Sequence, residues 1–116
     1  MTNIEKAMNR KDINMKELEI FVELVNIDRN FAEKLVDASD CGESVGSYAL
    51  CRYDEEQGFW DYEYSCEIKE IYEVYNNGKF IGYVGRTVRK SSWDNIWEDD
   101  FKIARVKEVT KLEWDI

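Results

Sequence analysis

The stretch from Ile71 to Val88 has the sequence IYEVYNNGKFIGYVGRTV. Two runs of β-branched and aromatic residues flank Asn77-Gly78, the preferred pair for a two-residue type I′ turn, in which both residues need positive φ. The stretch therefore predicts an antiparallel hairpin, and apolar residues on both faces predict a central place in the sheet. The expected cross-strand pairs are Tyr75 with Phe80, Val74 with Ile81, and Tyr72 with Tyr83.

Two more strands are predicted before this hairpin. Residues 47–53 and 59–69 alternate between apolar and polar side chains, as half-buried strands do. The residues between them, 54–58, have the sequence DEEQG, which predicts a turn. Within the hairpin, Gly82 and Gly85 predict close packing or a bulge.

Helices are predicted at the N-terminus. Capping-box patterns begin at Thr2, Asn14 and Asn30, and each precedes apolar residues at helical spacing. The second of these helices is expected over residues 15–25. Gly42 is a plausible end for the third.

The end of the chain is expected to hold a short helix from Ser92 to Trp97 and a last strand over residues 101–116. The predicted fold class is α+β, in one domain over residues 1–116. An N-terminal helical hairpin precedes an antiparallel sheet of four or five strands, with the short helix before the last strand.

Charge restricts the function more than any motif does. The chain has 25 acidic and 16 basic side chains and a formal net charge of −9. Residues 40–77 alone hold 10 acidic and 2 basic side chains, a net charge of −8. Such a surface repels nucleic acid and anionic lipid and attracts basic partners. We therefore expect no direct nucleic-acid partner and no membrane partner, and no apolar run is long enough to span a bilayer.

A row of carboxylates is the candidate binding site. In the strand predicted over residues 59–69, polar residues share the face opposite the aromatic ones, and the acidic residues of the turn extend the row. A regular line of negative charge can imitate the phosphates of a nucleic-acid strand. The predicted partner-binding residues are Asp54, Glu55, Glu56, Asp61, Glu63 and Glu67.

An enzymatic alternative uses part of the same strand. Asp61 or Asp54, followed by Glu67-x-Lys69, is similar to the pattern of metal-dependent nucleases, in which two carboxylates hold Mg²⁺ and the lysine stabilises charge. The surrounding negative charge is unfavourable for binding a polyanion. The acidic clusters at 54–56 and 98–100 lack the spacing of a calcium loop.

Other catalytic and metal sites find little support in the composition. The chain has no histidine, which removes the commonest general base and the commonest zinc ligand. Its three cysteines, Cys41, Cys51 and Cys66, have no C-x-x-C spacing. They are expected to be reduced thiols in a cytoplasmic protein, with Cys51 and Cys66 in the core. We expect no catalytic residues, no metal and no cofactor.

In size, charge and α+β pattern, the chain resembles the small acidic anti-defence proteins of phages and mobile elements, such as anti-CRISPR and anti-restriction inhibitors. It is equally similar to acidic immunity proteins that neutralise nuclease toxins. The resemblance implies a non-enzymatic inhibitor that binds a basic, nucleic-acid-handling protein. The alternatives are the Mg²⁺-dependent nuclease and a small housekeeping interaction domain.

Overall fold

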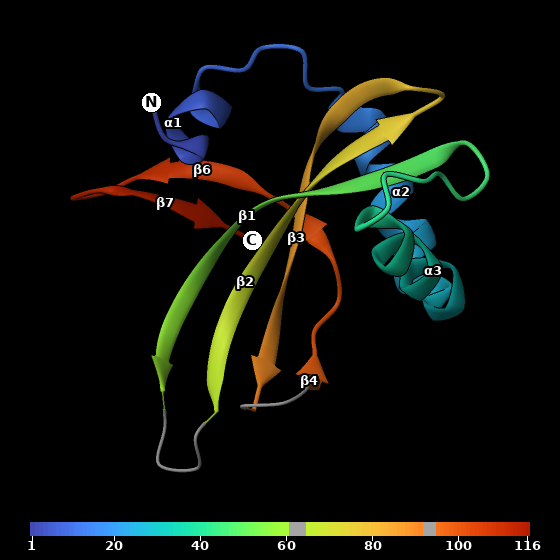
Figure 1. Cartoon of the computed structure of the whole chain (residues 1–116). Helices are drawn as coiled ribbons and strands as arrows, with labels where there is room; N and C mark the ends of the chain where they lie inside the picture. The colour runs from blue at the N-terminus through green and yellow to red at the C-terminus, as the bar shows by residue number, and fades with distance from the viewer. Residues whose placement is uncertain (61–64, 92–94) are drawn as a thin grey trace.

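The computed structural model describes residues 1–60, 65–91 and 95–116 of the chain. In these residues the helices come first and the strands follow, which is an α+β arrangement (Figure 1). The elements are α1 (Asn3–Met8), α2 (Met15–Ile27), α3 (Arg29–Ser39), β1 (Tyr48–Trp60), β2 (Cys66–Asn76), β3 (Lys79–Lys90), β4 (Asn95–Glu98), β5 (Lys102–Ile103), β6 (Arg105–Glu108) and β7 (Leu112–Asp115).

The main sheet is antiparallel and has five strands. Its order is β1-β2-β3-β4, and β5 also pairs with β3. Strands β6 and β7 form a separate two-stranded sheet. The antiparallel sheet of four or five strands is thus confirmed. Figure 1 shows that β1, β2 and β3 are long and extend well beyond the helices at one end.

The main sheet has an apolar core on each face. Helices α2 and α3 cover one face, and α1 with the β6–β7 hairpin covers the other (Figure 1). The first core holds Leu18, Phe21, Leu35, Leu50, Tyr72 and Val84 among others. The second holds Ala7, Ile71, Phe80, Tyr83, Ala104 and Trp114. Burial on both faces explains why the central strands are apolar on both sides.

Side-chain caps start the helices. Thr2 and Asn14 accept hydrogen bonds from the backbone N–H groups of Glu5 and Glu17, as the two capping boxes predict. The third helix starts earlier than predicted, because Asp28 accepts from the N–H of Phe31 at 3.1 Å in place of Asn30.

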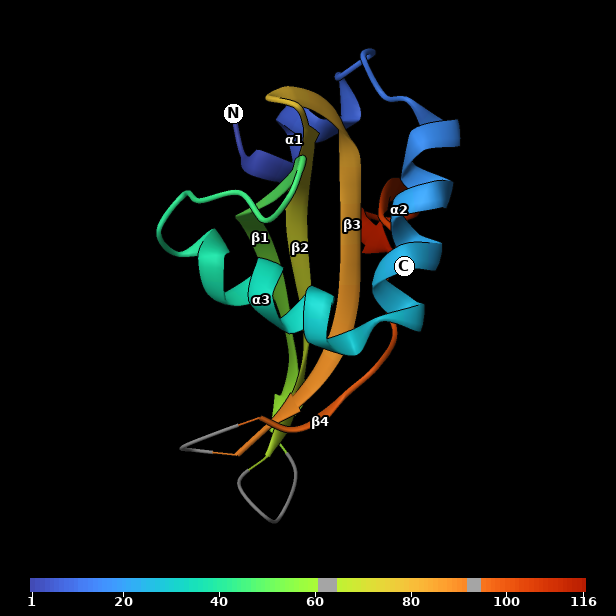
Figure 2. The same cartoon turned by 90° about the vertical axis from the view of Figure 1, so that its right-hand side faces the viewer.

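The expected N-terminal helical hairpin is wrong. Helix α1 comes first and packs against the β6–β7 side, apart from the other two helices. Only Asp28 separates α2 from α3, and its own N–H donates to the carbonyl of Leu24, so it also ends α2. A single residue leaves no room for a hairpin loop, and α3 runs across the direction of α2 rather than back along it (Figure 2).

The β2–β3 hairpin has the predicted turn. Asn77 and Gly78 have φ of 52° and 78°, and Tyr75 lies opposite Phe80 as expected. Beyond that pair the expected register is wrong, because Val74 pairs with Gly82 and Tyr72 with Val84. Ile81 is the extra residue of a bulge.

The bulge lies where α2 comes close to β3. Gly82 has φ of 150°, and a Cβ built on it would overlap Leu18 of that helix. Both parts of the expectation for Gly82, a bulge and close packing, are therefore confirmed.

The turn predicted over residues 54–58 is wrong. β1 continues to Trp60, with Asp54 opposite Ile71 and Gln57 opposite Ile68. Pairing with β2 therefore overrides the poor strand propensity of consecutive acidic residues. The predicted strand over 59–69 is also wrong, because Phe59 and Trp60 end β1 while Cys66 begins β2. Residues 61–64 lie outside the described residues.

The end of the chain also differs from the prediction. Residues 95–97 of the expected short helix belong to β4, in which Trp97 pairs with Arg89; residues 92–94 lie outside the described residues. The expected last strand is three short strands. Phe101 packs in the first core and Ala104 in the second, so the chain crosses from one face of the sheet to the other between them.

Candidate acidic binding surface

A buried ion cluster lies within the main sheet, around Glu70 of β2. Glu70 of β2 is 1% exposed. Its Oε2 lies 2.9 Å from Nη2 of Arg52, and its Oε1 accepts from Nε of Arg86 at 3.1 Å. Nζ of Lys90 lies 3.7 Å from Oε2, and the hydroxyl of Tyr72 donates to Oε1 at 3.2 Å. Residues from all three central strands thus surround one carboxylate.

These neighbours keep Glu70 ionised. Burial by itself would raise the pKa of Glu70, but the charges of Arg52 and Arg86 and their hydrogen bonds outweigh it, so the pKa lies below its ordinary value. Burial and the charge of Glu70 raise the pKa of Tyr72 to about 12. Tyr72 therefore stays protonated as a hydrogen-bond donor at neutral pH.

Arg86 connects this cluster to a cleft at the surface. Its Nη1 lies 3.2 Å from Oε2 of Glu98 in β4, and its guanidinium lies over the ring of Phe101. A hollow of about 220 Å³ opens above Arg86, with Glu33 and Asp37 of α3 on its other side. Asp37 is four positions after Glu33, a spacing that places both carboxylates on the same side of α3.

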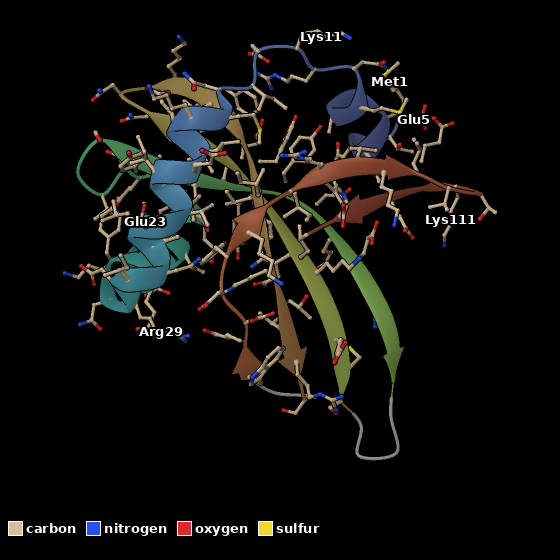
Figure 3. All side chains as sticks on the ribbon, turned by 180° about the vertical axis from the view of Figure 1, so that it is seen from behind. Met1, Glu5, Lys11, Glu23, Arg29 and Lys111 are labelled. Atoms are coloured by element: carbon tan, nitrogen blue, oxygen red, sulfur yellow. The ribbon has the colours of Figure 1, made fainter. Side chains whose placement is uncertain are left out.

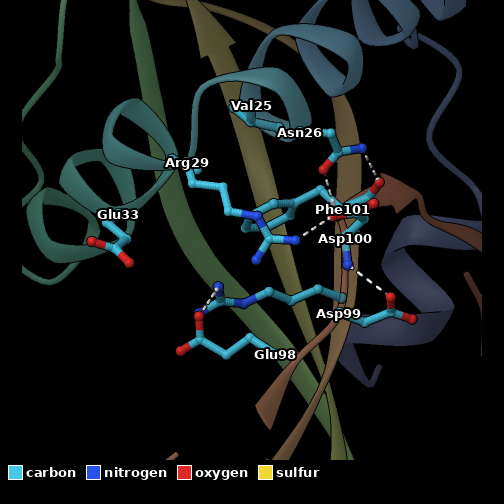
Figure 4. A pocket seen from close by; sticks show the side chains of 10 residues that line it. Val25, Asn26, Arg29, Glu33, Glu98, Asp99, Asp100 and Phe101 are labelled. Carbon is cyan, nitrogen blue, oxygen red and sulfur yellow. Dashed lines mark hydrogen bonds and ion pairs between the residues drawn. The ribbon is translucent and has the colours of Figure 1, made fainter.

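The segment after β4 forms the other wall of the cleft and is fixed to α2. The side-chain amide of Asn26 donates to the carbonyl of Phe101 at 2.9 Å and accepts from its N–H at 2.8 Å (Figure 4). Asp99 donates its N–H to the carbonyl of Thr87. These bonds hold Asp99 and Asp100 at the rim of the cleft.

Carboxylates outnumber cations along this cleft. We call it the acidic cleft and define it by Glu33, Asp37, Glu98, Asp99 and Asp100. Two arginines also line it: Arg86 at the base, and Arg29, which pairs with Asp100 at 3.0 Å. Lys102 lies 4.0 Å from Asp99. Glu33 and Asp37 have neither an ion pair nor a hydrogen bond with any described residue, so their charges face solvent.

The predicted acidic row does not form one exposed line. Asp54 accepts from the indole Nε1 of Trp114 at 2.9 Å, and Glu56 accepts from the backbone N–H of Trp114 at 2.7 Å. Both carboxylates therefore hold β7 against the sheet. Glu55, which faces the other side, is exposed and lies 3.8 Å from Arg52.

The remaining predicted residues lie near the end of the β1–β2 hairpin. Glu67 is exposed and lies 3.7 Å from Arg89, while Asp61 and Glu63 are outside the described residues. A partner-binding role for Glu55 and Glu67 stays a prediction. Asp54 and Glu56 are used within the protein.

Two residues of the nuclease alternative, Lys69 and Glu67, contact other groups, and Asp61 lies outside the described residues. Lys69 donates to the carbonyl of Trp114 at 2.9 Å and lies 3.7 Å from Glu56. Glu67 shares a strand face with Lys69 but pairs with Arg89. Over residues 1–60, 65–91 and 95–116, no group of three Asp, Glu or Cys side chains is arranged to hold a metal ion.

The cysteines were predicted in part. All three are free thiols, and Cys66 is buried as expected, whereas Cys51 is half-buried and Cys41 is exposed. Burial, followed by the charge of Glu73, raises the pKa of Cys51, which makes it less reactive.

The residues of the acidic cleft were present in the sequence but not grouped. The spacing of Glu33 and Asp37 indicates a shared helix face, whereas residues 98–100 indicate only an acidic cluster that lacks the spacing of a calcium loop. Their proximity to α3 depends on the path of residues 99–101 between β4 and β5, and no local pattern indicates that path.

Compared with protein-family models, curated proteins and solved structures, the chain has no match. None of the helices in the described part of the chain is long and apolar enough to cross a membrane.

Proposed function

We propose that the protein is a non-enzymatic inhibitor of a basic, nucleic-acid-handling protein, and that the acidic cleft is the face that contacts this partner. In this proposal the carboxylates occupy the groove of the partner in which phosphates would otherwise bind. The interaction takes place in the cytoplasm, and the role corresponds to that of an anti-defence or nuclease-immunity protein.

The observation that supports the proposal is the pair of uncompensated carboxylates on α3. Glu33 and Asp37 face solvent beside Glu98, Asp99 and Asp100, while the arginines of the cleft are already engaged. An arginine or lysine of a partner would gain charge-assisted hydrogen bonds there without displacing an internal ion pair. The net charge of −9 would attract such a partner over a distance.

The geometry also favours fast, specific binding. Asn26 fixes the backbone of residues 99–101, and helix α3 fixes the backbone that bears Glu33 and Asp37, so little backbone needs ordering when the partner binds. Preorganised contacts lose less conformational entropy on association.

The test is affinity capture from a host lysate at low and high salt, followed by mass spectrometry. The baits are the wild-type protein, Glu33→Lys/Asp37→Lys, and a control, Glu108→Lys/Asp115→Lys, which makes the same change in net charge on the exposed β6–β7 hairpin. We expect a basic nucleic-acid-binding protein to be captured by the wild type and the control and lost by the cleft variant. The captured protein is then assayed for nuclease or nucleic-acid-binding activity with and without the inhibitor.

Equal capture by the two variants would show that only the net charge matters and would overturn the assignment of the cleft. A captured protein whose activity is unchanged by the wild-type chain would overturn the inhibitor function.

A further inference from the structure

Helix α2 has apolar side chains on its outer face as well as its inner face. The inner residues, Leu18, Phe21 and Val25, are at most 2% exposed. On the outside, Ile20, Leu24 and Ile27 are 55%, 38% and 77% exposed. We call these three residues the α2 stripe.

The α2 stripe is not a scatter of single surface residues. Its members follow the spacing i, i+4, i+7, so they lie along one side of the helix. Of the seven large apolar side chains that are exposed in the described part of the chain, three belong to this stripe. Figure 3 shows α2 at the outside of the molecule, with no element of the described chain covering its outer side. Contiguous exposed apolar residues bordered by polar ones are typical of interaction sites.

The residues beside the stripe are mostly acidic. Glu19 and Glu23, both exposed, lie along one side, and Glu17 lies near the other. None of the three side chains forms an ion pair with a described residue. Lys16 is the one basic side chain of this face among residues 15–27.

These charges disfavour a second copy of the chain as the occupant. In an antiparallel pair of α2 helices, the glutamates of one copy would lie beside the acidic residues of the other, including Asp28. Like charges across an interface are costly. An anionic lipid surface is repelled by the same glutamates.

We propose that the α2 stripe binds an amphipathic helix of the partner, with apolar anchors that contact Ile20, Leu24 and Ile27 and with lysines or arginines that pair with Glu19 and Glu23. This inference rests on the proposed function, since it takes the basic partner as given. The C-terminal end of the stripe lies near the acidic cleft, because Asn26 and Arg29, on either side of Ile27 in the sequence, both line the cleft. One basic helix can therefore bury apolar residues on α2 while the surface next to it enters the cleft.

The test uses a synthetic helical peptide with leucines at i, i+4 and i+7 and lysines on the flanks. A matched peptide has glutamates in place of the lysines. Binding to the full chain is measured by calorimetry, and the contact is located from amide NMR signals. We expect the lysine peptide to bind and to shift signals of α2, and the glutamate peptide not to bind.

The variant Ile20→Gln/Ile27→Gln is expected to bind the lysine peptide at least roughly tenfold more weakly, as for the loss of central apolar anchors. Both side chains are exposed, so its melting temperature should equal that of the wild type. Val109→Gln, which changes a 59% exposed apolar residue between β6 and β7, is the control and should bind normally. Equal binding by wild type and double variant would overturn the proposal, because charge alone would then explain the interaction. Concentration-dependent dimerisation of the wild type that is lost in the double variant would overturn the proposal and assign the stripe to a second copy of the chain. Binding of the wild type to vesicles of phosphatidylglycerol would overturn it and assign the stripe to a lipid surface.

The two proposals fail in different ways. If the Ile20→Gln/Ile27→Gln bait still captures the natural partner as the wild type does, the helix-binding role of α2 is wrong and the proposed function stands. If no basic protein is captured by the wild type at all, the proposed function is wrong whatever the peptide does.

Discussion

Asp54 and Trp114 are joined by a hydrogen bond across 60 residues of sequence, with the indole Nε1 2.9 Å from Oδ2 of the carboxylate. Trp114 is 1% exposed, so removal of the carboxylate leaves a buried donor without a partner. We expect Asp54→Ala to lower the free energy of unfolding by about 1–3 kcal/mol. Urea unfolding followed by tryptophan fluorescence measures the change. Glu55→Ala, the neighbouring exposed carboxylate, should change it by about 0.5 kcal/mol or less, and equal losses would contradict the role given to Asp54.

Glu70→Gln tests the buried ion cluster. The substitution leaves Arg86, which is almost fully buried, and Arg52 without their central anion. Loss of one partner from a buried ion pair costs about 3–5 kcal/mol. The matched control is Glu67→Gln on the same strand, whose exposed pair with Arg89 is worth at most about 1 kcal/mol. Chemical unfolding of both variants at neutral pH gives the comparison.

The same carboxylate makes stability depend on pH. Because the pKa of Glu70 is lower in the folded protein than its ordinary value of 4.5, its contribution to stability is fully present above that pH. It is lost as the pH falls through the folded-state pKa. The difference in unfolding free energy between wild type and Glu70→Gln should therefore be constant near neutral pH and shrink below pH 4.5. A difference that grows on acidification would show that the pKa shift has the opposite sign.

Gly82→Ala should strongly destabilise the protein. Gly82 has φ of 150°, a backbone conformation that residues with a side chain rarely adopt, and a Cβ added at this position would overlap Leu18. We expect a loss of about 1–3 kcal/mol, as for overpacked core sites. The melting temperature measures it. Gly42→Ala serves as a control, since φ there is also positive, at 69°, but the added Cβ meets no atom; a loss as large as that of Gly82→Ala would assign the effect to φ alone.

Binding of the partner should depend on salt through its association rate. Glu33 and Asp37 are surface charges, and such charges steer the encounter more than they slow dissociation. Raising the ionic strength shortens the Debye length to about 3 Å at 1 M and screens this attraction. Stopped-flow or surface-plasmon measurements should show the association rate falling with salt for the wild type and less steeply for Glu33→Lys/Asp37→Lys. A salt effect confined to the dissociation rate would contradict this prediction.

Local sequence signals predicted the elements that depend on neighbouring residues. The turn at Asn77-Gly78 and the caps at Thr2 and Asn14 involve contacts within four residues, and all three are present. The register of the hairpin was lost at Ile81 because the bulge there depends on Leu18, which belongs to a distant helix.

Signals that compete with tertiary structure were misleading. The run DEEQG has the composition of a turn, yet Asp54 and Glu56 are strand residues, because this run pairs with β2 and Trp114 gives their carboxylates hydrogen-bond partners. Local patterns likewise do not indicate the acidic cleft, since residues 99–101 are held beside the helices by the two hydrogen bonds between Asn26 of α2 and Phe101. A sequence pattern indicates which side chains are charged, but the partners of those charges come from residues far along the chain.

The shared cap at Asp28 sets a fixed spacing. One residue ends α2 through its N–H and starts α3 through its side chain, so the angle between the two helices has little freedom to vary. The distance between the α2 stripe and the Glu33–Asp37 pair on α3 is therefore fixed. A protein with only apolar anchors would contact α2 alone, and one with only a basic group for the cleft would contact α3 alone. Selectivity among basic proteins would therefore come from the distance between these two contacts rather than from either contact by itself.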